Sequence, residues 1–139
     1  MKTLLTLTCA LFAAVAANAA SADGSYTGTY PLTVTKSDHS NGTYCLVLTD
    51  EVSSGRRHHG LAVLTSGPLV GLLPYGSFQV IDHIIVASGE QQLGDGNTAG
   101  LIFAGRAANG NISTLVYDQD YGGQSNDSGA VKIGEKNGC

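Results

Sequence analysis

The densest cluster of ionisable side chains is the segment GRRHHG, residues 55–60. Imidazole side chains serve as acid–base catalysts and as metal ligands, so this segment is the first candidate for chemistry. In a β-strand, however, the adjacent His58 and His59 project from opposite faces, and two ligands from one strand must lie at positions i and i+2. A metal site would therefore need a distant ligand, such as His39 or His83. We interpret the segment as the solvated beginning of a strand, we expect no metal site, and we keep a pocket lined by His59 as the alternative.

Asp82 is the second candidate, because an unbroken strand would bury its carboxylate. Such a strand would place Asp82 on the same apolar face as Val80 and Ile84. A buried carboxylate without a partner is costly. We expect instead a bend that turns Asp82 outward, since Asp is a common turn residue. The alternative is a functional acid inside the domain, where Asp82 would bind a ligand or form an acid–base pair with His59 or His83.

A third segment, DQDYGGQSNDSG at residues 118–129, offers oxygen ligands of the kind that bind Ca²⁺. Asp118 and Asp120 lie two residues apart, but the EF-hand pattern is absent and no glutamate closes the loop. We expect a flexible loop without an ion, because Gly, Ser, Asn and Asp are the common residues of turns. The chain also has no G-x-S-x-G motif and no glycine-rich phosphate-binding segment. We therefore expect no cofactor and no catalysis.

The fourth candidate is the apolar segment SGPLVGLLPYGSF, residues 66–78. Its prolines and glycines make a regular strand throughout improbable, yet it carries large apolar side chains. We expect this segment to plug one end of the fold. If it is exposed instead, Leu69, Leu72 and Tyr75 would form a surface that binds a ligand or a partner.

The elements that must position these residues are short β-strands, since alternation of period two recurs and no segment has a helical period. In YTGTYPLTVT, residues 26–35, Tyr, Leu and Val alternate with Thr. Pro31 lacks an N–H group, which favours an edge strand or a bulge. The pair Asn109-Gly110 suits a type I′ hairpin turn, and counting outward from it places Phe103 opposite Val116.

These strands predict an all-β fold. We expect a small antiparallel up-and-down barrel of about seven or eight strands, because closure removes exposed sheet edges. A two-sheet β-sandwich, which would also cover its inner faces, is the alternative.

Residues 1–19 have the features of a secretory signal peptide: Lys2, an apolar stretch, and Ala17-Asn18-Ala19 as small residues for cleavage. We expect cleavage near Ala19, a secreted or periplasmic location, and a single all-β domain over residues 20–139. The formal net charge is −4, and the basic side chains cluster only at Arg56-Arg57. This disfavours nucleic acids and anionic membranes as partners.

Cys45 and Cys139 remain after removal of residues 1–19. An even pair of cysteines in an oxidising compartment predicts one disulfide. An intramolecular bond would fasten residue 139 to the domain; a bond between two molecules is the alternative.

The sequence therefore predicts a small secreted or periplasmic binding protein that recognises an apolar small molecule or a protein partner, for example as an inhibitor. The ligand-binding residues that we expect are His59, Leu69, Leu72, Tyr75 and Asp82. One alternative is an extracytoplasmic enzyme that uses Asp82 and a histidine as an acid–base pair. Another is a surface or matrix subunit that assembles through an edge strand such as residues 26–35.

Overall fold

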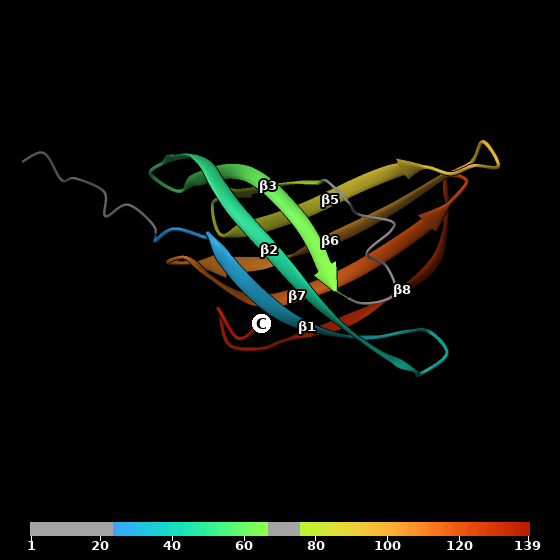
Figure 1. Cartoon of the computed structure of the whole chain (residues 1–139). Helices are drawn as coiled ribbons and strands as arrows, with labels where there is room; N and C mark the ends of the chain where they lie inside the picture. The colour runs from blue at the N-terminus through green and yellow to red at the C-terminus, as the bar shows by residue number, and fades with distance from the viewer. Residues whose placement is uncertain (1–23, 67–75) are drawn as a thin grey trace, which may run out of the picture.

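The computed structural model describes residues 24–66 and 76–139, which form a closed barrel of eight antiparallel strands (Figure 1). Each strand pairs with its neighbours in chain order, and the last strand pairs back with the first. The strands are β1 (Gly28–Thr35), β2 (Asn41–Ser54), β3 (Arg57–Ser66), β4 (Gly76–Ile81), β5 (Ile84–Gln92), β6 (Thr98–Ala108), β7 (Asn111–Tyr121) and β8 (Gln124–Ile133). The predicted all-β, up-and-down barrel is confirmed, and the sandwich alternative is wrong.

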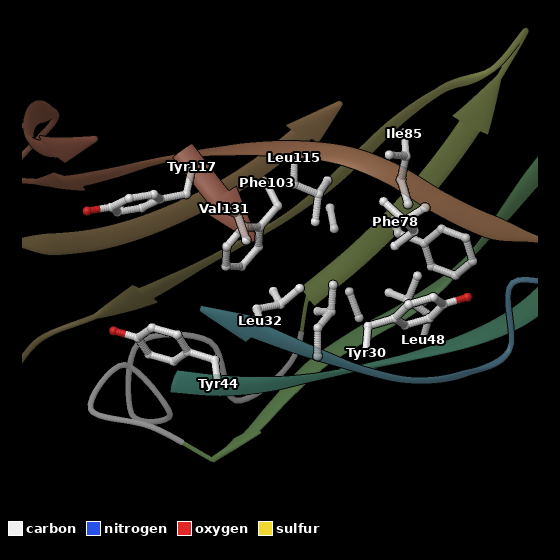
Figure 2. Close-up of a cluster of buried hydrophobic side chains, with 14 of the residues drawn as sticks. Tyr30, Leu32, Tyr44, Leu48, Phe78, Ile85, Phe103, Leu115, Tyr117 and Val131 are labelled. Atoms are coloured by element: carbon white, nitrogen blue, oxygen red, sulfur yellow. The ribbon is translucent and has the colours of Figure 1, made fainter. Parts of the chain in front are cut away.

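The barrel interior is filled by one cluster of apolar side chains that every strand contributes to (Figure 2). Alternate residues of each strand point inward because successive side chains of a strand leave on opposite faces. An eight-stranded barrel is just wide enough for such side chains to fill it. The largest fully buried members are Tyr26, Tyr30, Tyr44, Phe78, Phe103, Leu32, Leu46, Leu48, Leu64, Ile85 and Leu101.

The pairing of β1 with β8 is short, and a later segment of the chain completes it. The paired residues run only from Leu32 to Val34 on β1. The earlier half of β1 is covered by residues 134–139: the Gly134 N–H donates to the Pro31 carbonyl (2.7 Å), and the Asn137 N–H donates to the Thr29 carbonyl (2.6 Å). The expectation that Pro31 marks an edge strand is therefore wrong. Pro31 cannot donate, but its carbonyl accepts a hydrogen bond that seals this side of the strand.

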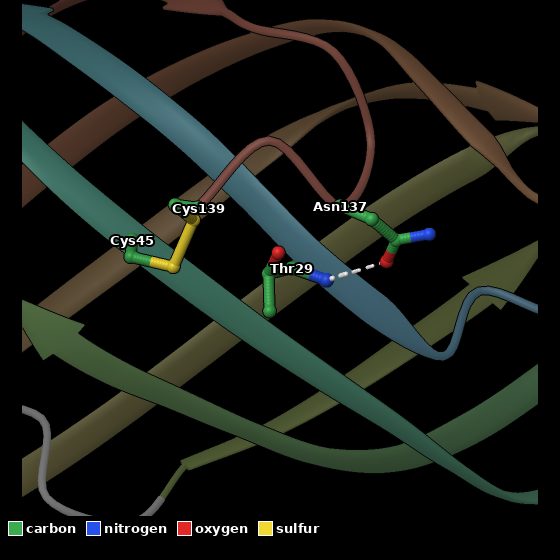
Figure 3. The surroundings of a disulfide bond; sticks show 4 residues. All are labelled: Thr29, Cys45, Asn137 and Cys139. Atoms are coloured by element: carbon green, nitrogen blue, oxygen red, sulfur yellow. Dashed lines mark hydrogen bonds between the residues drawn. A yellow bond between two sulfur atoms is a disulfide. The ribbon is translucent and has the colours of Figure 1, made fainter.

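A disulfide between Cys45 and Cys139 fixes residues 134–139 against the outside of β2 (Figure 3). The Thr29 N–H donates to Asn137 Oδ1 (3.3 Å) beside it. The predicted intramolecular bond is confirmed. Cys45 faces away from the barrel interior, as the alternation of Tyr44 and Leu46 into the core requires, and the covering segment buries it.

The hairpin between β6 and β7 has the predicted turn but a different register. Asn109 and Gly110 both have positive φ (51° and 75°), which a type I′ turn requires. The register then shifts by one residue next to Arg106, because Ser113 is left without a partner. Beyond this bulge Phe103 pairs with Tyr117, and both side chains are buried. The predicted pair of Phe103 with Val116 is wrong.

We expect loss of the disulfide to destabilise the fold strongly. The bond closes a segment with a sequence separation of 94 residues, for which chain-entropy arguments give about 4–5 kcal/mol. Cys139→Ser should lower the free energy of unfolding by about this amount in urea titrations. The exposed Cys139 is the better position for this test, since replacing the buried Cys45 would also leave a cavity.

Reduction of the wild-type protein supplies the control, because it should reproduce the loss without changing a side chain. If Cys139→Ser and reduction each lower the free energy of unfolding by less than about 1 kcal/mol, the disulfide does not stabilise the closed barrel as expected.

Candidate functional site

Asp82 and His83 form the two-residue turn between β4 and β5. Both have positive φ (48° and 71°), and the flanking residues Ile81 and Ile84 pair with each other. Asp82 is exposed. The predicted outward bend is confirmed, and the alternative of an acid buried inside the domain is wrong. The turn reverses the phase of the strand, so that Val80 points into the core while Ile84 points outward.

The two adjacent histidines lie on opposite faces of β3, as expected for a strand, but the inward one was not anticipated. His58 is buried in the barrel and His59 is exposed on its outer surface. The inward face of β3 is set by the buried Ala62 and Leu64. Interpreting residues 55–60 as a solvated strand start is therefore correct for His59 and wrong for His58. Within residues 24–66 and 76–139, no three His, Cys, Asp or Glu side chains are grouped so as to hold a metal ion.

His58 belongs to a polar cluster at one end of the barrel. Its Nδ1 lies 3.4 Å from Oδ2 of Asp50, and that oxygen also accepts hydrogen bonds from the Tyr26 N–H (2.7 Å) and the Ser25 hydroxyl (3.0 Å). The Tyr26 ring meets the imidazole edge-on at 4.8 Å. The carboxylate thus ties the chain ahead of β1 to β2 and β3.

The Asp50–His58 pair has the composition of an acid–base dyad but not its access. The His58 side chain is only 1% exposed, whereas a catalytic base must come within hydrogen-bond distance of its substrate. We assign this pair a positioning role at the barrel end. The sequence signal was weak, since the nearest neighbours of His58 on its face, Gly60 and Ala62, are small.

The opposite end of the barrel has a second polar cluster around Asp127. The Tyr117 hydroxyl donates to Oδ2 of Asp127 (2.7 Å) and the Ser37 N–H donates to Oδ1 (2.9 Å). Burial, helped by the bond to Asp127, raises the pKa of Tyr117. Partial burial opposes ionisation of Asp127, but the hydrogen bonds from Tyr117 and Ser37 prevail and lower the pKa of its carboxyl group. The interaction joins the β1–β2 connection to β8.

The segment expected to be a flexible loop, residues 118–129, is instead mostly a hairpin. β7 continues to Tyr121 and β8 begins at Gln124, with Gly122 and Gly123 at the turn. Asp118 and Asp120 lie on β7, opposite Ile102 and Gly100 of β6. Because most residues of this segment are polar, the alternation of inward and outward positions was not visible in the sequence.

The outer surface of β4–β7 carries a group of aliphatic side chains, which we call the aliphatic patch. Cross-strand pairing connects its members: Ile81 pairs with Ile84, Val86 with Ala104, and Ala104 with Val116. Ile84 and Val116 are 53% and 57% exposed. The members of the patch are Ile81, Ile84, Val86, Ile102, Ala104 and Val116.

Shallow hollows adjoin this patch, and two of them share Gln79 and Val86. One, of about 250 Å³, is lined by Gln79, Ile81, Asp82, Ile84 and Val86. The other, of about 210 Å³, includes His59 and Ser88. Of the expected ligand-binding residues, Asp82 and His59 therefore reach the same side of the barrel but line different hollows. Leu69, Leu72 and Tyr75 lie outside the described residues.

The other side of the barrel has a different surface. The outward positions of β1 and β2 include Thr33, Thr35, Thr43 and Thr49, which we call the threonine face. Threonine favours strands as valine and isoleucine do, because all three branch at Cβ. Strand propensity alone thus does not account for the aliphatic side chains on β4–β7, since threonine would serve there equally well.

We expect the Asp127 carboxylate to stabilise the fold in a pH-dependent way. Because its pKa is lower in the folded chain than in the unfolded one, its contribution is present above the ordinary Asp pKa of about 3.9 and is lost as the pH falls through the folded value. Asp127→Asn should therefore lower the free energy of unfolding at pH 7, and the difference from wild type should narrow below about pH 4.

Tyr117→Phe is the matched variant, because it removes the hydroxyl donor and keeps the carboxylate. Urea unfolding at pH 7 and pH 3 measures the free energy of unfolding of both variants. If Asp127→Asn lowers this free energy by the same amount at the two pH values, Asp127 acts through packing alone.

Comparisons with protein-family models, curated protein sequences and solved structures gave no match to this chain. Among the residues that the structure describes, no helix is long and apolar enough to cross a membrane.

Proposed function

We propose that this protein is a non-catalytic binding protein that acts outside the cytoplasm and holds a protein partner against the aliphatic patch. The observation that carries the proposal is the patch itself: aliphatic side chains that cross-strand pairing connects lie about half exposed on the outer surface of β4–β7. Rimmed apolar patches on soluble proteins commonly mark contact sites.

The nature of the hollows favours a protein over a small apolar molecule. Pockets for small ligands enclose most of the ligand surface. Here side chains fill the barrel interior, and the hollows beside the patch are shallow and open on the outer surface. A shallow surface with exposed aliphatic groups suits the broad contact that another protein makes.

The placement of the ionisable groups supports a role without catalysis. In the Asp50–His58 pair the imidazole is buried and the carboxylate is largely buried. His59 and Asp82 line separate hollows rather than one cavity. His83 follows Asp82 in the β4–β5 turn and does not line the hollow beside it. Assembly through a free β1 edge is also disfavoured, since that strand is covered by β8 and residues 134–139.

The proposed location rests on the disulfide and on residues 1–19. A structural disulfide is compatible with an oxidising compartment outside the cytoplasm. The charged start, apolar stretch and small residues of 1–19 are the features of a signal peptide that would deliver the chain there.

The test is capture of a partner by the secreted protein, with and without the patch. In chemical cross-linking in the fluid of the producing cells, wild type should give a defined adduct of higher mass. Ile84→Asp should weaken partner binding by about tenfold or more, as expected when a charge replaces an aliphatic contact at an interface. Titration of the purified partner measures the change.

Thr49→Asp is the matched control, because it places the same charge at an exposed outward position of β2 and should bind like wild type. Equal weakening by both variants would exclude the patch as the contact. A defined thermal shift with apolar small molecules, lost in Ile84→Asp, would instead favour a small ligand.

A further inference from the structure

We propose that the partner on the aliphatic patch is a second copy of this chain, bound as a two-fold symmetric dimer with the strands of the two patches antiparallel. This inference rests on the proposed function, because it names the occupant of the same surface. Its evidence is the distribution of charge around the patch.

The two ends of the patch carry opposite charges. At one end, Arg57 pairs with Ile81 and Arg106 pairs with Ile84 across neighbouring strands. At the other end, Asp118 pairs with Ile102, while Glu90 and Asp120 flank Gly100 from either side. Within the described part of the chain, none of these five side chains takes part in an ion pair. Both arginines thus lie at one end of the strands, where the β4–β5 turn also holds Asp82, and three carboxylates lie at the other end.

A two-fold axis makes this arrangement self-complementary. In a symmetric dimer the same surface meets itself, so residue i of one copy meets residue j of the other and the reverse. An axis perpendicular to the strands, through the row of Val86 and Ala104, reverses the strand direction of the second copy. Arg106 then lies over Ile102 and beside Asp118 of the second copy. A parallel arrangement would instead bring arginine near arginine, which costs free energy.

The acidic end also contains a hollow that can receive a guanidinium group. It measures about 440 Å³ and is lined by Ser88, Gly89, Glu90, Gly100, Leu101, Ile102 and Asp120. Gly100 makes room for the Asp120 carboxylate, which lies where a Cβ at this position would stand. In the antiparallel dimer this hollow faces the exposed Arg106 of the other copy, which has the planar donor geometry that suits carboxylates.

The aliphatic patch forms the centre of the contact, and the charged side chains form its rim. Ile81, Ile84 and Val86 remove apolar surface from water when they are covered. Two sets of opposite charges at the rim select the antiparallel orientation, which is the usual contribution of charged rims to interfaces. Each copy has a formal net charge of −4, but at the contact itself Arg106 of one copy lies beside Asp118 of the other.

The decisive experiment is a charge exchange measured by sedimentation equilibrium on the full secreted chain. Wild type should dimerise reversibly with rising concentration. Arg106→Glu should weaken the dimer by about tenfold or more, since it faces acidic groups of the second copy. The double variant Arg106→Glu with Asp118→Arg should restore dimerisation, because both facing pairs regain opposite charges. Thr49→Asp should dimerise like wild type.

The outcomes separate this inference from the proposed function. Wild type that stays monomeric up to about 1 mM, or a dimer that neither Ile84→Asp nor Arg106→Glu weakens, overturns the inference. A monomer that still captures a different protein through the patch overturns the dimer and leaves the proposed function standing. A monomer without patch-dependent capture overturns both. Restoration by the charge exchange is the result that a merely structural role of Arg106 would not give.

Discussion

Closure of the barrel depends on a short contact between its first and last strands. β1 and β8 share only the pairs from Leu32 to Val34 on β1, so their backbone pairing alone is a weak link in an otherwise long ladder. Residues 134–139 complete it with backbone hydrogen bonds to β1 and with the disulfide to Cys45. A closed barrel has no free strand edges, and here that property depends on this six-residue segment and one covalent bond.

Because the barrel is closed and narrow, its inner and outer surfaces differ in composition. The inside is occupied by apolar side chains, with polar clusters around Asp50 and Asp127 near the two ends. On the outside, strand pairing sets which residues are neighbours. The aliphatic patch and its charged ends consist of residues far apart in sequence, from Arg57 to Asp120, that the register brings into adjacent rows.

The sequence predicted the fold class, the disulfide and the Asn109-Gly110 turn because each depends on local pattern or on composition. One error arose where a single residue changes the phase of a strand: Ser113 bulges and moves Phe103 opposite Tyr117. A one-residue slip moves every later side chain to the other face of the sheet, and alternation by itself does not locate such slips.

The candidate site was less predictable for a related reason. His58 was placed in solvent because its inward neighbours Gly60 and Ala62 are small, and its partner Asp50 comes from another strand. The aliphatic patch was not found, since valines and isoleucines at outward positions look the same in sequence as those of the core. Only the register distinguishes them: Ile84 and Ile85 are adjacent, yet one is exposed and the other fully buried.

The covering of β1 by residues 134–139 has a consequence for the order of biosynthesis. The partners of β1 on its second side, β8 and Asn137, are made after all other strands. While the chain emerges from the ribosome, successive hairpins can pair, but the sheet stays open with β1 exposed. Protection of that strand from premature association must therefore come from chaperones or from rapid completion of synthesis.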